Sequence, residues 1–207
     1  MKTIQIANVD IDIHEQGVGI LCSGGADSSL LLYILMKNIS TPIHIFTCTN
    51  KKKNYSNLSV INKVITTCIE LTKNNNIFHH IHFVEEQTED NMYLYSHFKL
   101  IKILYTGITR NPPTEITDTW NQPNTEHEER NPNIQRDFYH RNNTFYTPFH
   151  RVNKKVIAEM YKELDLLTSL YPLTRSCEHE LLTEGHCGEC WWCLERQWAF
   201  DIDKSNL

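Results

Sequence analysis

The stretch that decides the fold of this chain reads Gly19-Ile20-Leu21-Cys22-Ser23-Gly24-Gly25-Ala26-Asp27-Ser28-Ser29-Leu30. The apolar run 18–22 has the length of a short buried strand, and 30–36 has the apolar spacing of a helix. Between them, Ser23–Ser29 is rich in glycine and serine and is called the glycine loop below. A strand, a tight loop and a helix N-terminus predict an anion site, because first-turn N–H groups lack internal partners and the helix dipole favours negative charge.

The composition of the glycine loop narrows the kind of anion site. Gly24 and Gly25 permit positive φ and let an oxyanion approach the backbone. The loop lacks the lysine of the common Gly-x-x-x-x-Gly-Lys-Ser/Thr nucleotide loop, and it does not have the Gly-x-Gly-x-x-Gly spacing. Asp27 is predicted to bind Mg²⁺, which prefers carboxylate and phosphate oxygens. The alternative is a structural turn in which Asp27 is only a helix-start carboxylate.

The size and charge of the chain limit the function classes. Its 207 residues suffice for one large domain with a small appendage and a real core. A net charge of −5 argues against a general nucleic-acid or membrane-surface binder. No stretch approaches about 18 apolar residues, so no membrane span is expected. Because the segment 1–13 also lacks a signal-peptide core, we expect a cytoplasmic protein.

Further strands are predicted at 42–48, 77–84 and 101–105, with helical patterns between them. Strands that alternate with helices indicate a parallel sheet with right-handed crossovers. The strand at 77–84 carries three histidines, so it is predicted at a sheet edge rather than in the apolar centre. The sequence therefore predicts an α/β fold with a five-stranded, doubly wound parallel sheet in the order 3-2-1-4-5.

This strand order places the first and fourth strands side by side at the point where the winding of the sheet reverses. Ligands bind there, outside the carboxyl ends of the strands. The two ends that meet are the glycine loop and the segment from Gly107 to Arg110. We therefore expect Gly107 and Arg110 near the bound ligand, with a solvated loop arginine as the alternative for Arg110.

Composition divides the chain into segments. Residues 1–16 alternate polar and apolar side chains and predict a hairpin or extension, and 17–170 form the α/β domain. Within it, 108–146 is a long polar stretch with several prolines, predicted as a flexible flap over the site or, alternatively, a surface insertion. The segment 171–207 holds a cluster of cysteines.

Lys154 is a candidate phosphate ligand. It follows Asn153, which is predicted to cap a helix that continues through Ile157 and Met160. The dipole of a helix disfavours a cation in its first turn, and a nearby polyphosphate would reverse that penalty. The alternative is a simple solvated lysine.

The pattern Cys177-x9-Cys187-x2-Cys190-x2-Cys193 is a strong metal signal. Four thiolates at this spacing suit tetrahedral zinc, and a closed four-sulfur site of this kind is structural. Bound zinc would hold a segment with little apolar content, where a hydrophobic core alone could not.

Alternatives to a four-cysteine zinc site stay open. An iron–sulfur cluster also binds cysteine thiolates, and His179 or His186 could replace one cysteine. A disulfide is a poor explanation in a reducing compartment. The other cysteines lie in apolar patterns and are predicted to be buried small hydrophobes: Cys22, Cys48 and Cys68.

Two motifs carry a family resemblance. Ser23-Gly24-Gly25-Ala26-Asp27-Ser28 resembles the pyrophosphate loop of the ATP pyrophosphatase superfamily. The closing stretch 187–196 is similar to the Cys-Gly-x-Cys-x-x-Cys-x-x-Arg ending of 7-cyano-7-deazaguanine synthase, the nitrile-forming enzyme family of queuosine biosynthesis. Thr147-Pro148-Phe149 followed by Lys154 resembles the Thr-Pro-Leu…Lys segment of that family. The family's substrate segment after the fourth strand is not recognisable, because Thr109–Pro113 and a long insertion stand in its place.

The resemblance implies an adenine nucleotide alpha hydrolase-like fold that uses ATP, Mg²⁺ and structural Zn²⁺. It implies a small-molecule substrate, 7-carboxy-7-deazaguanine or a related acid, with ammonia as the second reactant, and it suggests a homodimer. Asp27 and Lys154 are implied as catalytic residues. The implied nucleotide contacts are Leu21, Cys22, Ser23, Gly24, Gly25, Ala26, Asp27, Ser28, Ser29, Leu30, Gly107 and Arg110.

In the implied reaction a carboxylate attacks the α-phosphate of ATP, and the acyl-adenylate takes ammonia to give an amide. A second activation then dehydrates the amide to the nitrile. The enzyme contributes mostly positioning and charge stabilisation, so no covalent nucleophile is needed, and Cys22 is favoured as a core residue. One rival function is modification of tRNA or another macromolecule, which predicts a basic groove. The other is a non-catalytic nucleotide-binding module.

Overall fold

The computed structural model describes residues 1–50, 56–84, 101–120, 137–140, 143–177 and 185–202. Their elements, in chain order, are β1 Lys2–Ile6, β2 Val9–Ile13, β3 Val18–Leu21, α1 Ala26–Asn38, β4 Ile43–Asn50, α2 Ser56–Thr72, β5 Ile77–Val84, β6 Ile103–Tyr105, α4 Thr114–Thr117, the 3-10 helix η1 Asp118–Trp120, β7 Asp137–His140, β8 Asn143–Tyr146, α5 Lys154–Glu163, the 3-10 helix η3 Tyr171–Leu173 and α6 Trp191–Phe200.

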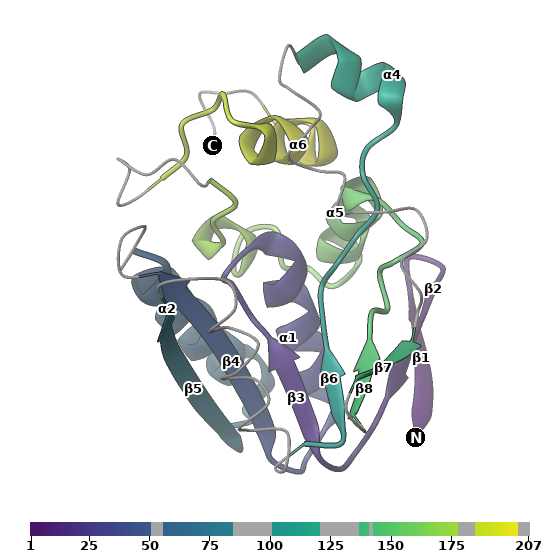
Figure 1. The fold of residues 1–207 in the computed structure, drawn as a ribbon, viewed down its shortest axis with the longest axis vertical. Coiled ribbons are helices and arrows are strands. Elements are labelled where there is room, and N and C mark those ends of the chain that lie inside the picture. Colours follow the sequence, from purple (N-terminus) through teal and green to yellow (C-terminus); the bar gives the residue numbers. More distant parts are fainter. Residues whose placement is uncertain (51–55, 85–100, 121–136, 141–142, 178–184, 203–207) are drawn as a thin grey trace.

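The central sheet has the strand order β5-β4-β3-β6-β8-β7 (Figure 1). The first five strands in this order are parallel, and β7 pairs with β8 in the antiparallel sense. The predicted parallel order 3-2-1-4-5 is confirmed, and the histidine-rich strand β5 lies at the edge of the described sheet. The carboxyl ends of β3 and β6 are neighbours, as the prediction of a ligand site there requires.

The end of the segment 108–146 differs from the expected flap or insertion. It supplies β7 and β8, and β8 is the fifth parallel strand. Phe145 and Tyr146 give β8 a short apolar end, and Tyr146 is buried. Because β8 is short and the residues before it in the sequence are polar, no alternation of polar and apolar residues predicted this strand. The parts of the segment at 121–136 and 141–142 lie outside the described residues.

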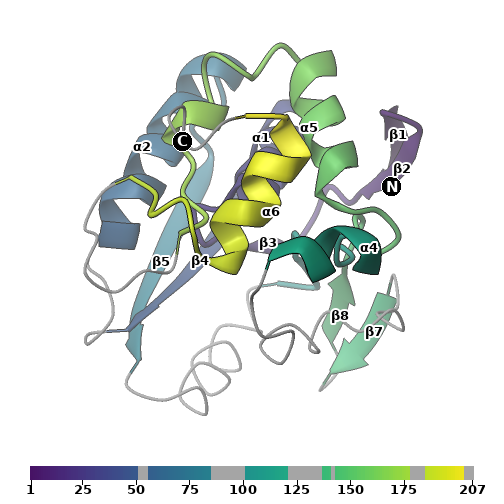
Figure 2. The same ribbon diagram turned by 90° about the horizontal axis from the view of Figure 1, so that it is seen from above.

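Helix α1 forms the centre of the core. It is apolar on nearly all sides, and its side chains from Leu30 to Met36 are buried. Burial of a leucine or isoleucine side chain stabilises the fold by about 1.5–3 kcal/mol relative to exposure. Figure 2 shows α1, α2 and α5 along one face of the sheet, with α6 above the carboxyl ends of the strands. The helix that begins at the glycine loop is therefore largely buried in the core.

The opposite face of the sheet carries a smaller apolar cluster of Phe46, Ile101 and Leu104. Gly19 in the middle of β3 makes this packing possible. A Cβ at Gly19 would lie 2.9 Å from Ile101 Cδ1 and 3.0 Å from both Leu104 Cδ1 and Phe46 Cε2. The sheet face therefore needs a glycine at this position.

The N-terminal segment forms the expected hairpin of β1 and β2, with Ala7 and Asn8 at positive φ in its turn. Two buried tyrosine hydroxyls attach the hairpin to the sheet. Tyr105 Oη donates to the carbonyl of Asp12 at 2.8 Å, and the amide of Asp12 donates to Tyr146 Oη at 2.8 Å. Among the described residues, no helix has the length and apolar character needed to cross a membrane.

Candidate functional site

The glycine loop connects β3 directly to α1. Gly24 has φ +82°, and a Cβ there would lie 2.9 Å from Val60 Cγ1, so this turn requires glycine. Gly25 is the N-cap of α1 and provides no side-chain cap. Its own amide donates to Ser23 Oγ at 3.3 Å, and the hydroxyls of Ser23 and Ser28 lie 3.3 Å apart. The start of α1 is therefore a helix N-terminus that an anion can cap.

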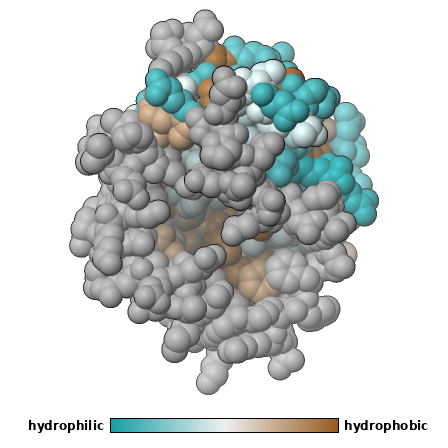
Figure 3. All heavy atoms as spheres, turned by 45° about the horizontal axis from the view of Figure 1, so that its top comes forward, coloured by the Kyte–Doolittle hydropathy of each residue, from teal (hydrophilic) through white to brown (hydrophobic). Residues whose placement is uncertain are grey.

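The glycine loop borders a cavity of about 510 Å³, within the range of about 300–1,000 Å³ that is typical of small-molecule sites. Figure 3 shows a hollow with hydrophobic residues in the middle of this face of the molecule. Three strand ends, the first turn of α1 and the start of α6 surround the cavity. Its lining residues are Leu21, Cys22, Ser23, Gly25, Asp27, Ser28, Phe46, Cys48, Thr106, Gly107, Ile108, Thr109 and Trp192.

The predicted meeting of the glycine loop with the end of β6 is present. A Cβ at Gly107 would lie 2.8 Å from the amide nitrogen of Ser28 and 3.0 Å from the carbonyl carbon of Asp27, so only glycine lets the two backbones approach this closely. Gly107 lines the cavity. Arg110 is exposed, outside the cavity lining, and its amide donates to the carbonyl of Val152 at 2.8 Å.

Other residues of the predicted contact set face the core. Ala26, Ser29 and Leu30 are buried within α1. Cys22 borders the cavity but is 2% exposed, and burial raises the pKa of its thiol to about 11. A thiol with this pKa is protonated at neutral pH and is a poor nucleophile. The structure therefore agrees with the interpretation of Cys22 as a core residue.

Asp27 and Lys154, the two predicted catalytic residues, contact each other. Lys154 Nζ lies 3.2 Å from Asp27 Oδ2 and 2.8 Å from Glu195 Oε2. Asn153 caps α5, as predicted, by accepting a hydrogen bond from the amide of Lys155. Lys154 is 2% exposed, so it is not a solvated lysine. In the structure two carboxylates compensate the charge of Lys154 in the first turn of α5.

Sequence reasoning missed the contribution of α6. Glu195 is fully buried beside Lys154, although no sequence motif marked it as a site residue. Trp192 lines the cavity, and its ring centroid lies 6.0 Å from Lys154 Nζ. The signal was the spacing of these residues by three positions, which puts both on the same side of a helix. The direction of that side depends on how α6 docks.

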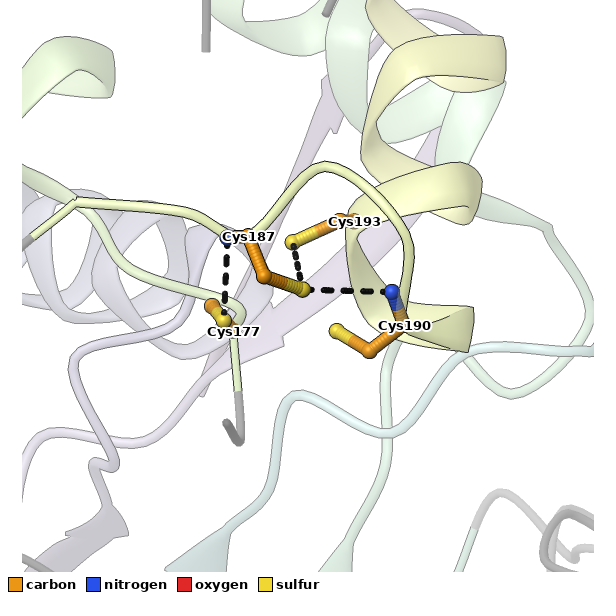
Figure 4. A group of neighbouring side chains, drawn as sticks. All are labelled: Cys177, Cys187, Cys190 and Cys193. Carbon is orange, nitrogen blue, oxygen red and sulfur yellow. Dashed lines mark hydrogen bonds between the residues drawn. The ribbon is translucent and has the colours of Figure 1, made fainter. Parts of the chain in front are cut away.

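The cysteine centre consists of Cys177, Cys187, Cys190 and Cys193, whose Sγ atoms all lie within 4.8 Å of one another (Figure 4). Cys187 Sγ lies 3.8 Å from Cys193 Sγ and accepts the amide of Cys190 at 3.2 Å. The amide of Cys187 donates to Cys177 Sγ at 3.4 Å. Four thiol side chains gathered this closely can bind a metal ion.

Arg175 connects the cysteine centre to the glycine loop. Its amide donates to the carbonyl of Gly24 at 2.9 Å, and its Nε donates to the carbonyl of Gly185 at 3.0 Å. Arg175 is buried and stands two residues before Cys177. The backbone that carries the first cysteine is therefore hydrogen-bonded to the glycine loop.

Arg196, the arginine of the closing motif, is buried and holds η3 against α6. It donates to Thr174 Oγ1 at 2.8 Å and to the carbonyl of Tyr171 at 3.1 Å, and its guanidinium carbon lies 3.9 Å from the centroid of the Tyr171 ring. Burial lowers the pKa of Arg196, and neighbouring groups that include Cys193 oppose this effect. The motif arginine thus has a packing role beside the cysteine centre.

Together these features define an α/β protein with a glycine loop at the reversal point of its sheet and a cysteine centre connected to that loop through Arg175. The family model described as "Queuosine biosynthesis protein QueC" matches residues 129–204. This match confirms the family resemblance over the C-terminal part of the chain. No curated protein matches the sequence.

Two solved structures are similar in fold. The U34-tRNA thiolase NcsA from Methanococcus maripaludis, solved with its [4Fe-4S] cluster, aligns at 12% identity and a TM-score of 0.48 over 74% of this chain. The chain spans only 58% of the length of that thiolase. NMN synthetase from Francisella tularensis aligns at 14% identity and a TM-score of 0.47, over 90% of this chain and 84% of its own.

Proposed function

We propose that the protein is an ATP-dependent ligase that adenylates the carboxylate of a small molecule. The observation that carries this proposal is the uncapped N-terminus of α1, which opens on a cavity that also has Asp27 in its wall. Backbone amides there can bind the leaving pyrophosphate, and the carboxylate can bind its metal ion. The match to the QueC family at the other end of the chain supports the same chemistry.

The cavity offers a polar end and an apolar end for ATP. Ser23, Gly25 and Ser28 would hold the β- and γ-phosphates, and Asp27 would bind Mg²⁺. When bound, Mg²⁺ neutralises phosphate charge and makes pyrophosphate a better leaving group. Leu21, Phe46 and Cys48 form the apolar part of the wall, which suits the adenine ring.

The acceptor would lie between the end of β6 and Trp192. The indole of Trp192 is a suitable surface for a planar heterocycle, and Thr106 to Thr109 form the facing wall. A carboxylate oxygen of the acceptor forms a bond to the α-phosphorus while the bond to the β-phosphate oxygen breaks. Ammonia then displaces AMP from the acyl-adenylate to give an amide.

The family match supports a finer assignment. The acceptor would be 7-carboxy-7-deazaguanine, and a second ATP would convert the amide to the nitrile with loss of the amide oxygen to phosphorus. We extend the proposal to a cytoplasmic homodimer, as the resemblance implies. A reducing compartment would also keep the cysteines of the centre reduced and free of disulfides.

The cysteine centre would hold one zinc ion. Zn–S bonds of about 2.3 Å in a tetrahedron place neighbouring sulfurs about 3.8 Å apart. Cys187 Sγ and Cys193 Sγ lie 3.8 Å apart, and every Sγ pair lies within 4.8 Å. A single ion therefore fits between the four thiolates, whereas an iron–sulfur cubane is larger and needs more space. With four protein ligands the zinc would be structural.

The test is release of AMP and pyrophosphate by the purified protein with ATP, Mg²⁺, ammonium and 7-carboxy-7-deazaguanine. We expect acid-dependent release, and we expect Asp27→Asn to reduce it by about 10²–10³-fold, because a metal ligand supplies several kcal/mol of charge stabilisation. The matched control is Asp165→Asn. Asp165 is exposed and has a positive φ, which asparagine also adopts readily. Absence of both products with every acid tried would contradict the proposed function.

A further inference from the structure

Lys154 is a buried cation held from two sides. Its Nζ lies 2.8 Å from Glu195 Oε2 and 3.2 Å from Asp27 Oδ2, and the exposed fractions are 2% for Lys154 and 0% for Glu195. The three side chains come from three different helices, α1, α5 and α6. The shorter contact is with Glu195. Lys154 is therefore anchored more closely to α6 than to Asp27.

In this group one ammonium lies between two carboxylates, and the charge of the buried Arg196 also acts on Asp27. Asp27 is the member of the group to which a divalent cation could bind. Asp27 lines the cavity, so such a cation can reach it, and it would compete with Lys154 for the same carboxylate.

We propose that Glu195 is a positioning residue that keeps Lys154 beside the glycine loop when Asp27 binds magnesium pyrophosphate. This inference rests on the proposed function. As Asp27 turns to the magnesium ion, Lys154 loses Asp27 as a partner, and Glu195 retains the Lys154 ammonium group behind the cavity lining. From there Lys154 would face the phosphate oxygens, because its Nζ lies 3.2 Å from Asp27 Oδ2 and 6.0 Å from the Trp192 ring, and both of these residues line the cavity.

Stability alone does not account for such a trio. Replacing a buried ion pair by apolar residues of similar volume is often neutral or stabilising, whereas removing one partner costs about 3–5 kcal/mol. The effects of these three side chains on folding and on ligand binding can therefore be measured separately with two kinds of variant. Lys154→Met combined with Glu195→Leu gives an apolar pair that should fold, and Glu195→Gln keeps the shape of Glu195 while removing its charge.

The experiment measures binding of inorganic pyrophosphate to the metal-loaded protein by calorimetry at several Mg²⁺ concentrations. Glu195→Gln should weaken pyrophosphate binding by about tenfold or more and raise the Mg²⁺ concentration needed for half-saturation, because Lys154 then holds Asp27 as its only anionic partner. The apolar double variant should keep the melting temperature of the wild type but bind pyrophosphate as weakly. The control is Glu159→Gln, an exposed residue of α5.

Wild-type affinity and Mg²⁺ dependence in a folded Glu195→Gln protein would overturn the inference, as would wild-type affinity in the double variant. Because the measurement involves no turnover, its outcome is separate from the proposed reaction. If the wild type binds magnesium pyrophosphate but converts no acid, the reaction is wrong while the role of Glu195 stands.

Discussion

The glycine loop and the cysteine centre are built from opposite kinds of chemical group. The binding role proposed for the loop depends on backbone amides, so it needs glycine, an uncapped helix N-terminus and an open cavity. The cysteine centre consists of side chains, and its four Sγ atoms lie within 4.8 Å of one another. The loop is formed by residues adjacent in sequence, whereas Cys177 and Cys187 are separated by nine residues in the sequence.

The difference between these two regions shows how a binding surface and a structural support can share one site. The open loop lets a ligand enter, and the closed centre fixes the start of α6. Helix α6 then brings Trp192 to the cavity and Glu195 to Lys154. None of the four cysteines is among the cavity-lining residues, so the cysteine centre is linked to the cavity through α6 and through the hydrogen bond from Arg175 to Gly24.

The largest effect is expected for Cys193→Ser. Loss of one thiolate should remove the metal and lower the melting temperature strongly, since structural zinc contributes several kcal/mol or more to folding. The measurements are metal content per chain and thermal unfolding. Asp165→Asn, at an exposed position with positive φ, is the comparison and should keep both metal content and melting temperature close to wild type. A metal-depleted protein that stays fully folded would contradict a structural role for the cysteine centre.

An intermediate effect is expected for Gly107→Ala. The added Cβ would lie 2.8 Å from the amide nitrogen of Ser28, so either β6 or α1 must shift. Overpacking of this kind costs about 1–3 kcal/mol, and displacement of the glycine loop should also weaken binding of ATP. Chemical denaturation and nucleotide titration measure the two effects.

The control for Gly107→Ala is Gly185→Ala beside the cysteine centre. Nothing lies within 4 Å of a Cβ there, and only its positive φ opposes the substitution, at a cost of about 1–2 kcal/mol. Gly185→Ala should leave ATP binding unchanged. Equal loss of nucleotide affinity in both variants would show that the contact of Gly107 with α1 has no special role.

The smallest effect is expected from the titration of His79. Its ring lies 3.0 Å from Thr47 Oγ1, which donates to the carbonyl of Cys22 beside the glycine loop. Burial lowers the pKa of His79, so the unfolded chain binds the proton more readily than the folded protein. Stability should therefore fall as the pH drops through about 6.5, the ordinary pKa of histidine.

The free energy of unfolding can be measured by chemical denaturation between pH 8 and pH 5. These two pH values lie about one unit or more on either side of the ordinary pKa of histidine. His79→Gln, which can still hydrogen-bond Thr47, should show a flatter profile. If His79→Gln has the same dependence of stability on pH as the wild type, groups other than His79 cause the loss of stability in acid.

The local motifs could be predicted from the sequence because each depends on neighbouring residues. The glycine loop, the Asn153 cap of α5 and the Cys-x2-Cys-x2-Cys run are all set by short spacings. The parallel order of the sheet could also be predicted, since right-handed crossovers leave few topologies. The strand β8 was missed because its apolar part is only two residues long within a polar segment.

By itself, the sequence determined the glycine loop between a strand and a helix, the α/β class and the set of four cysteines that could hold a metal ion, because backbone freedom and ligand chemistry are properties of residue types at short range. Only the tertiary structure decided that Lys154 is buried between Asp27 and Glu195, that Gly107 contacts the backbone of Ser28, and that Trp192 borders the cavity. The contacts of Asp27 with Lys154 and of Ser28 with Gly107 join residues more than seventy positions apart in the sequence. The placement of Trp192 and Glu195 depends on which side of α6 faces inward. Such contacts follow from how the helices dock on the sheet, and no local spacing encodes that docking.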